Sequence, residues 1–430
     1  MNAVTNTRPA TASRHAGSIA IIGVLFFIIG FFTWINGPLI TFVKLAFDLD
    51  EVKAFFVVFV FYISYFVLAL PASWALKRTG LKKGLALSLF VMAVGAAVFG
   101  ELSTQRIYAG ALTGLFIIGG GLALLQTAVN PYISILGPIE SAAQRIALMG
   151  ICNKIAGMLA PVLIGSLVLH GFGDLSTQVA AADAATKAVL LDEFAAKIHT
   201  PYLVMAGVLV LVAIAILFSS LPEIKPSEAN AEHGNSATAG KGSVFQFPHL
   251  WLGVLCLFVY VGVEVLAGDA IGTYGNGFGL PLDETKFFTS FTLGAMLLGY
   301  LVGLVAIPRF ISQERYLSLS AILGVLFALG AFLTHGYVSV GFVAALGFAN
   351  AMMWPAIFPL AIKGLGRFTE TGSALLIMGI AGGAIIPQLF AVLKQHHDFQ
   401  LVFVLLAVPC YLYILFFALR GHRVGKAQGA

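Results

Sequence analysis

The sequence predicts an all-α membrane protein whose twelve transmembrane helices form two parallel six-helix halves. Three observations support this fold class: an apolar composition, a regular series of long apolar stretches, and an internal repeat. Of 430 residues, 59% are hydrophobic and 10% are charged, and the mean hydropathy is +0.97. A soluble domain carries about 25% charged residues. The composition therefore excludes an ordinary soluble protein and makes a lipid bilayer the expected surrounding of this chain.

Windows of about 20 apolar residues, the length that crosses a bilayer, define the expected spans. The first stretch is too long for the hydrophobic region of a signal peptide, so it is expected to remain as a transmembrane helix. Two stretches, 107–136 and 338–362, are long enough to tilt or kink. The twelve expected spans are 18–43, 54–76, 83–101, 107–136, 146–169, 201–221, 249–274, 287–307, 316–335, 338–362, 373–394 and 400–420.

Charged residues in the connections predict the orientation. Basic residues gather at both termini and in alternate connections such as 77–83 and 309–315, whereas acidic residues gather on the opposite side, as in 48–51. Because basic connections stay in the cytoplasm, both termini are expected to be cytoplasmic, in a bacterial inner membrane. The Ala-rich segment 171–200 is interpreted as an external loop that can hold a surface helix.

One long hydrophilic stretch divides the spans six and six. We predict an N-terminal half over residues 1–221, a cytoplasmic linker over 222–247 and a C-terminal half over 248–430. The three cysteines lie inside apolar runs, which disfavours a disulfide framework or a zinc site.

An internal repeat relates the two predicted halves. Four short matches occur in the same order at offsets of 229–233 residues, which is hard to attribute to chance. An even number of spans in each half leaves the two copies parallel, an arrangement that places a substrate near the bilayer midplane between them. The matched pairs are 22–25 with 252–255, 49–53 with 282–286, 77–83 with 309–315, and 146–151 with 375–380.

Several segments resemble the fucose–galactose–glucose:cation symporters, a family with the major facilitator fold. Residues 126–138 (QTAVNPYISILGP) are similar to the signature segment of that family on the fourth helix. Further similarities are found at 31–34, at 260–262 and at 361–366. The resemblance spans most of the chain and implies transport of hexoses or related sugars, usually together with protons.

The sequence also departs from this family in ways that affect the expected function. Fucose-type members place acids on the first helix and at the start of the signature segment, where this chain has Gly37 and Gln126. The segment 34–40 (WINGPLI) is more similar to the branch linked to glucose, galactose and N-acetylglucosamine. The resemblance therefore implies a neutral monosaccharide of this class, and the usual proton-carrying acids are missing.

Three charged residues, Lys154, Glu264 and Asp269, lie well inside predicted spans. Such groups cost about 2.5–3.5 kcal/mol on insertion scales, so they usually face a cavity or a partner. The repeat pairs Glu264 with Trp34. Glu264 is the first candidate for cation coupling and Asp269 the second. A structural ion pair between Glu264 and Lys154, and a solvated Asp269, are the alternatives.

Neutral amides in the apolar helices are the candidate substrate ligands. An amide both donates and accepts hydrogen bonds, which suits sugar hydroxyls, although amides also bond neighbouring helices. Two tryptophans are candidates for stacking on the C–H face of a sugar. The candidate substrate-binding residues are Trp34, Asn36, Gln126, Asn130, Asn153, Asn350 and Trp354.

Other classes of function have little support. We find no HExxH zinc motif, no paired catalytic aspartates and no Ser–Lys arrangement in a span, so the chain is not expected to be an enzyme. We expect import of a neutral monosaccharide by cation symport with alternating access, a proton being favoured over sodium; a uniporter or an exporter of the same fold is the alternative. No cofactor and no nucleic acid are expected, a metal site stays undetermined, and the protein is expected to act as a monomer.

Overall fold

A computed structural model describes residues 9–135, 142–219, 221, 243–307, 309–365 and 368–425. Within these ranges the side chains of 9–16, 130–131, 133–135, 142–146 and 369–370 are not described. Every regular element in the described ranges is a helix. Twelve of the described segments are long and apolar enough to cross a membrane, which confirms the predicted fold class. The predicted linker lies almost wholly outside the described residues, so the exact boundaries between the halves stay a prediction.

The described part of the first half contains ten helices, which form six spans and two helices outside them. They are α1 (Pro9–Trp34), α2 (Asn36–Ala46), α3 (Glu51–Ala54), α4 (Phe56–Thr79), α5 (Leu81–Thr104), α6 (Tyr108–Ile135), α7 (Ala142–Leu167), α8 (Phe172–Ala181), α9 (Ala184–Ala196) and α10 (His199–Phe218).

The described part of the second half repeats this order of spans and has no counterparts of α8 and α9. Its helices are η3 (Val244–Gln246), α12 (Pro248–Gly268), α13 (Ile271–Asn276), α14 (Leu282–Thr285), α15 (Phe288–Ala306), α16 (Gln313–Leu333), α17 (Gly336–Asn350), α18 (Met353–Ile362), α19 (Thr369–Met378), η5 (Gly379–Ala381), α20 (Gly382–Leu393), α21 (Phe399–Leu419) and η6 (Gly421–Arg423).

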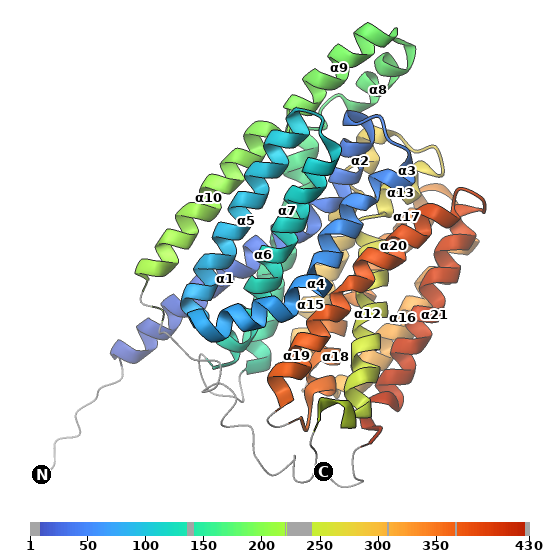
Figure 1. Cartoon of the computed structure of the whole chain (residues 1–430). Coiled ribbons are helices and arrows are strands. Elements are labelled where there is room, and N and C mark those ends of the chain that lie inside the picture. Colours follow the sequence, from blue (N-terminus) through green and yellow to red (C-terminus); the bar gives the residue numbers. More distant parts are fainter. Residues whose placement is uncertain are drawn as a thin grey trace, which may run out of the picture.

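The two halves lie side by side, the first in blue to green and the second in yellow to red (Figure 1). We call the end where α10 finishes and α12 begins the linker end, and the opposite end, which carries α8 and α9, the α8–α9 end. The segment 171–200, expected to be a loop with a surface helix, contains both α8 and α9, and the sixth span is α10.

The interface between the halves follows the repeat. In it, α7 packs on α15, and α4 packs on α19, η5 and α20. The second span of each half therefore meets the fifth span of the other half. This exchange is what a twofold relation between two parallel copies produces.

Several spans are broken, and local sequence explains the clearest case. Between α1 and α2 the helix is interrupted at Ile35. Pro38 has no N–H to donate to the carbonyl of Trp34, and its ring crowds the preceding turn. The kink expected in 338–362 is present between α17 and α18, whereas α6 is unbroken. The break between α12 and α13 was not predicted.

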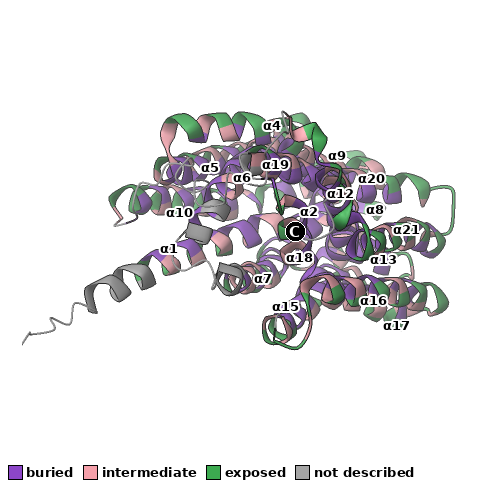
Figure 2. Ribbon diagram, turned by 90° about the horizontal axis from the view of Figure 1, so that it is seen from below, coloured by how far each residue is buried: buried purple, intermediate pink, exposed green. Residues whose placement is uncertain are grey.

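Burial follows the faces that the helices turn toward one another. Buried residues gather on inward faces and exposed residues on outward faces (Figure 2). Many exposed residues are large and apolar, such as Phe218 and Leu333, as expected for a surface in contact with lipid. Inside, close approach requires glycine: a Cβ on Gly30 of α1 would lie 2.0 Å from the carbonyl oxygen of Asn153 on α7. Small residues at such crossings let membrane helices pack tightly.

Candidate functional site

Two broken spans face each other across the interface between the halves. In the first half the break separates Trp34 from Asn36, and in the second half it follows Gly268. The two regions touch, because a Cβ on Gly268 would lie 2.3 Å from the Trp34 ring. Transporters built from repeats place substrate and ion sites at the repeat interface, where interrupted helices leave backbone and side-chain groups available. The candidate site is therefore built around these two breaks.

A buried ion pair connects the halves beside the breaks. Lys154 Nζ on α7 lies 3.2 Å from Glu264 Oε1 on α12, and the two side chains are 8% and 11% exposed. The same ammonium lies 4.7 Å from the centre of the Trp34 ring and 6.0 Å from that of Tyr300. An ammonium over an aromatic ring is stabilised by the ring's negative face. The pairing that the sequence left open is thus present.

Tyrosines surround Glu264 and were missed by the sequence analysis as site residues. The hydroxyls of Tyr260, Tyr300 and Tyr411 all lie within electrostatic reach of its carboxylate. Tyr260 precedes Glu264 by four residues, so the two share a helix face. That spacing was the available signal for Tyr260. Nothing in the sequence indicates the other two, which come from α15 and α21.

The side-chain amide of Asn350 forms a hydrogen bond through only one of its two polar atoms among the described residues. Its Oδ1 accepts a hydrogen bond from the Tyr411 hydroxyl at 2.9 Å, while its Nδ2 is buried without a partner among the described residues. A buried amide donor without a partner costs about 1–3 kcal/mol. A ligand oxygen placed there would recover this cost, so Asn350 stays a candidate for substrate binding.

Asn36, at the first break, also has one side-chain polar atom without a hydrogen-bond partner among the described residues. It is fully buried, and its Nδ2 donates to the carbonyl of Thr33 at 3.1 Å. Its Oδ1 has no hydrogen-bond partner among the described residues, and the hydroxyl of Thr33 has none of normal geometry there. The hydroxyl of Tyr62, on α4, is likewise buried without a partner. Unsatisfied donors and acceptors are therefore concentrated where the two halves meet.

The other candidates are distributed around this centre. Gln126 Nε2 donates to the Tyr65 hydroxyl at 3.0 Å, and Asn153 Nδ2 donates to the carbonyl of Phe26 at 3.4 Å. The second contact joins α7 to α1, which fits the interhelical alternative for Asn153. Trp354 stacks on Phe358 of its own helix, with ring centres 5.9 Å apart. The side chain of Asn130 lies outside the described part of the structure.

Asp269 ends α12 at the second break and is 2% exposed, so it is not solvated in this conformation. Neither carboxylate oxygen has a hydrogen-bond partner of normal geometry among the described residues. The backbone N–H of Gly37 stabilises its charge through a contact outside that geometry. Asp269 thus differs from Glu264, whose carboxylate has a cation beside it. Its unpaired position makes it the most unusual charged group in the described core.

Polar contacts also join the halves at the α8–α9 end, in two clusters that we call clasps. In the first clasp, Lys394 Nζ lies 2.6 Å from Glu51 Oε2, and Gln388 Nε2 donates to the carbonyl of Val52 at 3.1 Å. Burial lowers the pKa of Lys394, and the adjacent Glu51 carboxylate opposes that shift. The first clasp is therefore a cross-half ion pair supported by a backbone contact.

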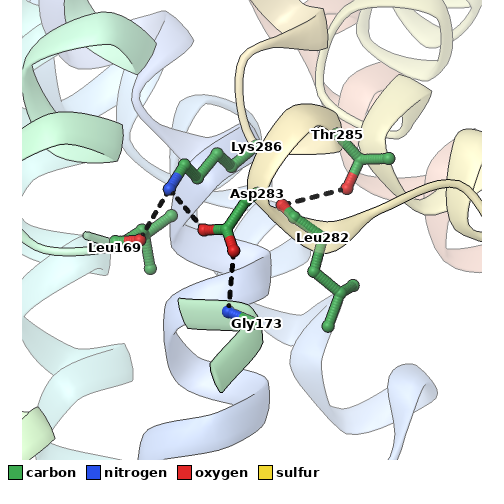
Figure 3. Close-up of polar contacts among 6 residues, drawn as sticks. All are labelled: Leu169, Gly173, Leu282, Asp283, Thr285 and Lys286. Atoms are coloured by element: carbon green, nitrogen blue, oxygen red, sulfur yellow. Dashed lines mark hydrogen bonds and ion pairs between the residues drawn. The ribbon is translucent and has the colours of Figure 1, made fainter. Parts of the chain in front are cut away.

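The second clasp involves the repeat-related segment of the other half (Figure 3). Lys286 Nζ donates to the carbonyl of Leu169 and to Asp283 Oδ1, both at 2.8 Å. Asp283 Oδ2 accepts from the backbone N–H of Gly173 at 3.2 Å. The repeated segments 49–53 and 282–286 thus supply charged residues to both clasps. In this conformation the α8–α9 end is held together.

A polytopic membrane protein with two six-helix halves and a polar midplane is typical of a transporter. The chain matches the Major Facilitator Superfamily over residues 22–387. It is 32% identical over 421 residues to the glucose/galactose transporter of Brucella abortus biovar 1 (strain 9-941), covering 97% of both chains. It is 28% identical over 371 residues to the L-fucose-proton symporter of Escherichia coli (strain K12), covering 85% of this chain and 84% of the relative.

Solved structures agree with these relatives. The crystal structure of the transporter FucP in the outward conformation matches with a TM-score of 0.74 and 25% identity, over 95% of this chain and 99% of that one. The inward open structure of the xylose transporter XylE from E. coli matches in fold alone, with a TM-score of 0.68 and 12% identity, over 94% of this chain and 96% of that one.

The chain belongs to the Major Facilitator Superfamily and, within it, to the fucose–galactose–glucose symporter family. It is a multi-pass membrane transporter of a sugar-transporting family and not an enzyme. The resemblance inferred from the sequence is thereby confirmed.

Proposed function

We propose that this protein imports a neutral monosaccharide of the glucose, galactose or N-acetylglucosamine class by cation symport, with a proton favoured over sodium. One observation carries the proposal: two buried hydrogen-bonding groups, Asn36 Oδ1 on the first half and Asn350 Nδ2 on the second, have no partner among the described residues. A neutral polyhydroxylated ligand can satisfy both an acceptor and a donor. The glucose/galactose transporters and L-fucose-proton symporters among its relatives support the same class of substrate and coupling.

The proposed sugar site lies between the halves. It combines amides that bond hydroxyls with rings that cover the apolar face of a sugar. Its residues are Trp34, Asn36, Gln126, Asn130, Asn153, Asn350 and Trp354, with Glu264, Lys154 and Asp269 as the group proposed for cation coupling.

The proposed orientation follows from the basic connections. The linker end and both termini face the cytoplasm of a bacterial cell, and the α8–α9 end faces outward across the inner membrane. With the clasps closed, a sugar site at midplane would be reached from the linker end. We propose a monomer as the transporting unit, since each half of the site comes from the same chain.

The test is uptake by the purified full-length protein in liposomes. Labelled glucose, galactose and N-acetylglucosamine are offered separately, with a pH gradient or a sodium gradient imposed one at a time. We expect concentrative uptake of at least one sugar with the pH gradient, and none in protein-free liposomes. Equilibration of the sugar without accumulation under either gradient would identify a uniporter. Net movement of the sugar only in the direction against the cation gradient would identify an exporter. Failure to move any sugar in exchange or net flux would contradict a sugar transporter.

A further inference from the structure

The two breaks are equivalent positions of the internal repeat. Gly37 and Asp269 are 232 residues apart, within the range of offsets that relates the two halves. They are also in contact, because a Cβ on Gly37 would lie 3.4 Å from Asp269 Cα and 2.4 Å from Thr289 Oγ1. The pseudo-twofold relation between the halves therefore brings these two residues together. At this junction the first half contributes Gly37, which has no side chain, and the second half contributes the carboxylate of Asp269.

The charged and titratable groups around Asp269 leave its charge without compensation. Its own helix contributes Glu264, a second negative charge, whose cation Lys154 on α7 lies beside Glu264 itself. From α4 comes the hydroxyl of Tyr62, which has no hydrogen-bond partner among the described residues. On α15, the hydroxyl of Thr289 donates to the carbonyl of Gly268 at 2.8 Å and is thus already engaged. No positive charge is directed at Asp269 within the described core.

An ionised carboxylate in such a place is expensive. The effective penalty for burying an ion is several kcal/mol, and one contact with a backbone N–H outside normal hydrogen-bond geometry offsets little of it. The carboxyl group therefore has to be neutral, or hold a cation, whenever the halves close over it as they do here. When the halves separate at this junction, water reaches it and its ionised form is favoured.

We propose that Asp269 is the residue that binds and releases the coupling cation, and that this cation is a proton. This assignment rests on the proposed symport and specifies which of its charged residues acts. A carboxylate oxygen takes a proton from water on one side of the membrane and carries it, as the neutral acid, through the closed junction. It then returns the proton to water on the other side. No other bond forms or breaks.

The same geometry gives Glu264 a different role. Its carboxylate is paired with Lys154 at 3.2 Å, so closure of the halves does not leave its charge without a partner. A charged group can influence the alternation only if the free energy of holding its charge differs between the two conformations. Asp269 meets this condition because Gly37, which lies against it, belongs to the other half. The ordering of candidates suggested by the sequence, Glu264 before Asp269, is therefore reversed in the proposal.

The first test compares Asp269→Asn with the matched control Asp174→Asn, an exposed aspartate on α8. Both are reconstituted in liposomes that contain a pH-sensitive dye. Asp269→Asn should lose at least tenfold in pH-driven accumulation and in sugar-induced proton movement, while retaining counterflow of the same sugar. The control should match the wild type. Unchanged accumulation and proton movement in Asp269→Asn would overturn the proposal, and so would wild-type accumulation driven by sodium but not by a pH gradient.

A second measurement remains decisive if Asp269→Asn does not fold. Infrared difference spectra of the wild-type protein between about pH 7 and a higher pH, a range in which exposed carboxyl groups are already ionised, should contain a carbonyl band of a protonated carboxylic acid. That band should shift when the protein carries aspartate labelled with ¹³C, and it should not shift when glutamate is labelled instead. A band that follows the glutamate label would overturn the assignment to Asp269. Because this experiment needs no sugar, it gives a result even if the proposed sugar transport fails.

Discussion

The buried pair of Lys154 and Glu264 allows a quantitative test of how charge is held in this interface. At 3.2 Å the two charges attract each other by about 5 kcal/mol at an effective dielectric constant of about 20. Desolvation consumes several kcal/mol of this for each ion, so the net value of the pair is small. Removing one partner is different, because the other charge stays buried alone. Lys154→Met and Glu264→Gln should each destabilise the protein by about 3–5 kcal/mol.

The double variant separates this explanation from simple loss of packing. If the penalty arises from an unpaired buried charge, Lys154→Met combined with Glu264→Gln should be more stable than the sum of the singles by about 3 kcal/mol.

Thermal unfolding of the purified variants in one detergent, followed by tryptophan fluorescence, gives the comparison. The control is Lys187→Met, which removes the surface pair of Lys187 with Asp48 at 2.7 Å. That pair is exposed, and its loss should cost no more than about 1 kcal/mol. Single-variant effects that add within about 0.5 kcal/mol in the double variant would refute the reasoning.

Three further predictions concern substrate, conformation and orientation. Gln126→Ala and Asn130→Ala should each weaken sugar affinity by roughly five- to a hundredfold, as expected for one lost hydrogen bond of about 1–3 kcal/mol; normal affinity in both would make them packing residues. Lys286→Met combined with Lys394→Met removes a cation from each clasp and should lengthen the distance between spin labels on α9 and at the start of α17, whereas an unchanged distance would show that the clasps do not hold this end. A cysteine replacing Ser236 should react with an impermeant reagent only after the cells are permeabilised, and labelling of intact cells would reverse the proposed topology.

The fold was largely predictable because each membrane span is visible in the sequence as a long apolar stretch. Twenty apolar residues are needed to cross a bilayer whatever the tertiary structure, and the repeat adds the parallel relation of the halves. The sequence-based prediction was incomplete where contacts between distant parts of the chain determine the local structure. The break after Gly268 has no proline at the junction comparable to Pro38 in the first half. The segment 171–200, interpreted as a loop that can hold one surface helix, contains two helices, and Asp183 caps the second, α9, by accepting from the N–H of Thr186.

The candidate site was predictable by residue type and much less by geometry. A charge inside a span is conspicuous in any sequence, so Lys154, Glu264 and Asp269 were found. The pairing of Lys154 with Glu264 was one of the alternatives, and the sequence could not decide between them because the two residues are 110 residues apart and come from different halves. The tyrosines around Glu264 were overlooked for a related reason. Twelve tyrosines occur in the chain, and only tertiary structure selects those whose hydroxyls face the interface.

Duplication followed by divergence at equivalent positions explains why the polar groups are distributed as they are. The segments 49–53 and 282–286 kept similar charges, and each now supplies a clasp at the same end of the molecule, as closing one end of a twofold arrangement requires. At the breaks the copies diverged, and Gly37 of the first half lies opposite Asp269 of the second. Identical carboxylates on both sides of that junction would repel each other when the halves close. A carboxylate opposite bare backbone avoids this repulsion, so in the proposed mechanism closure over Asp269 depends on the protonation of a single group.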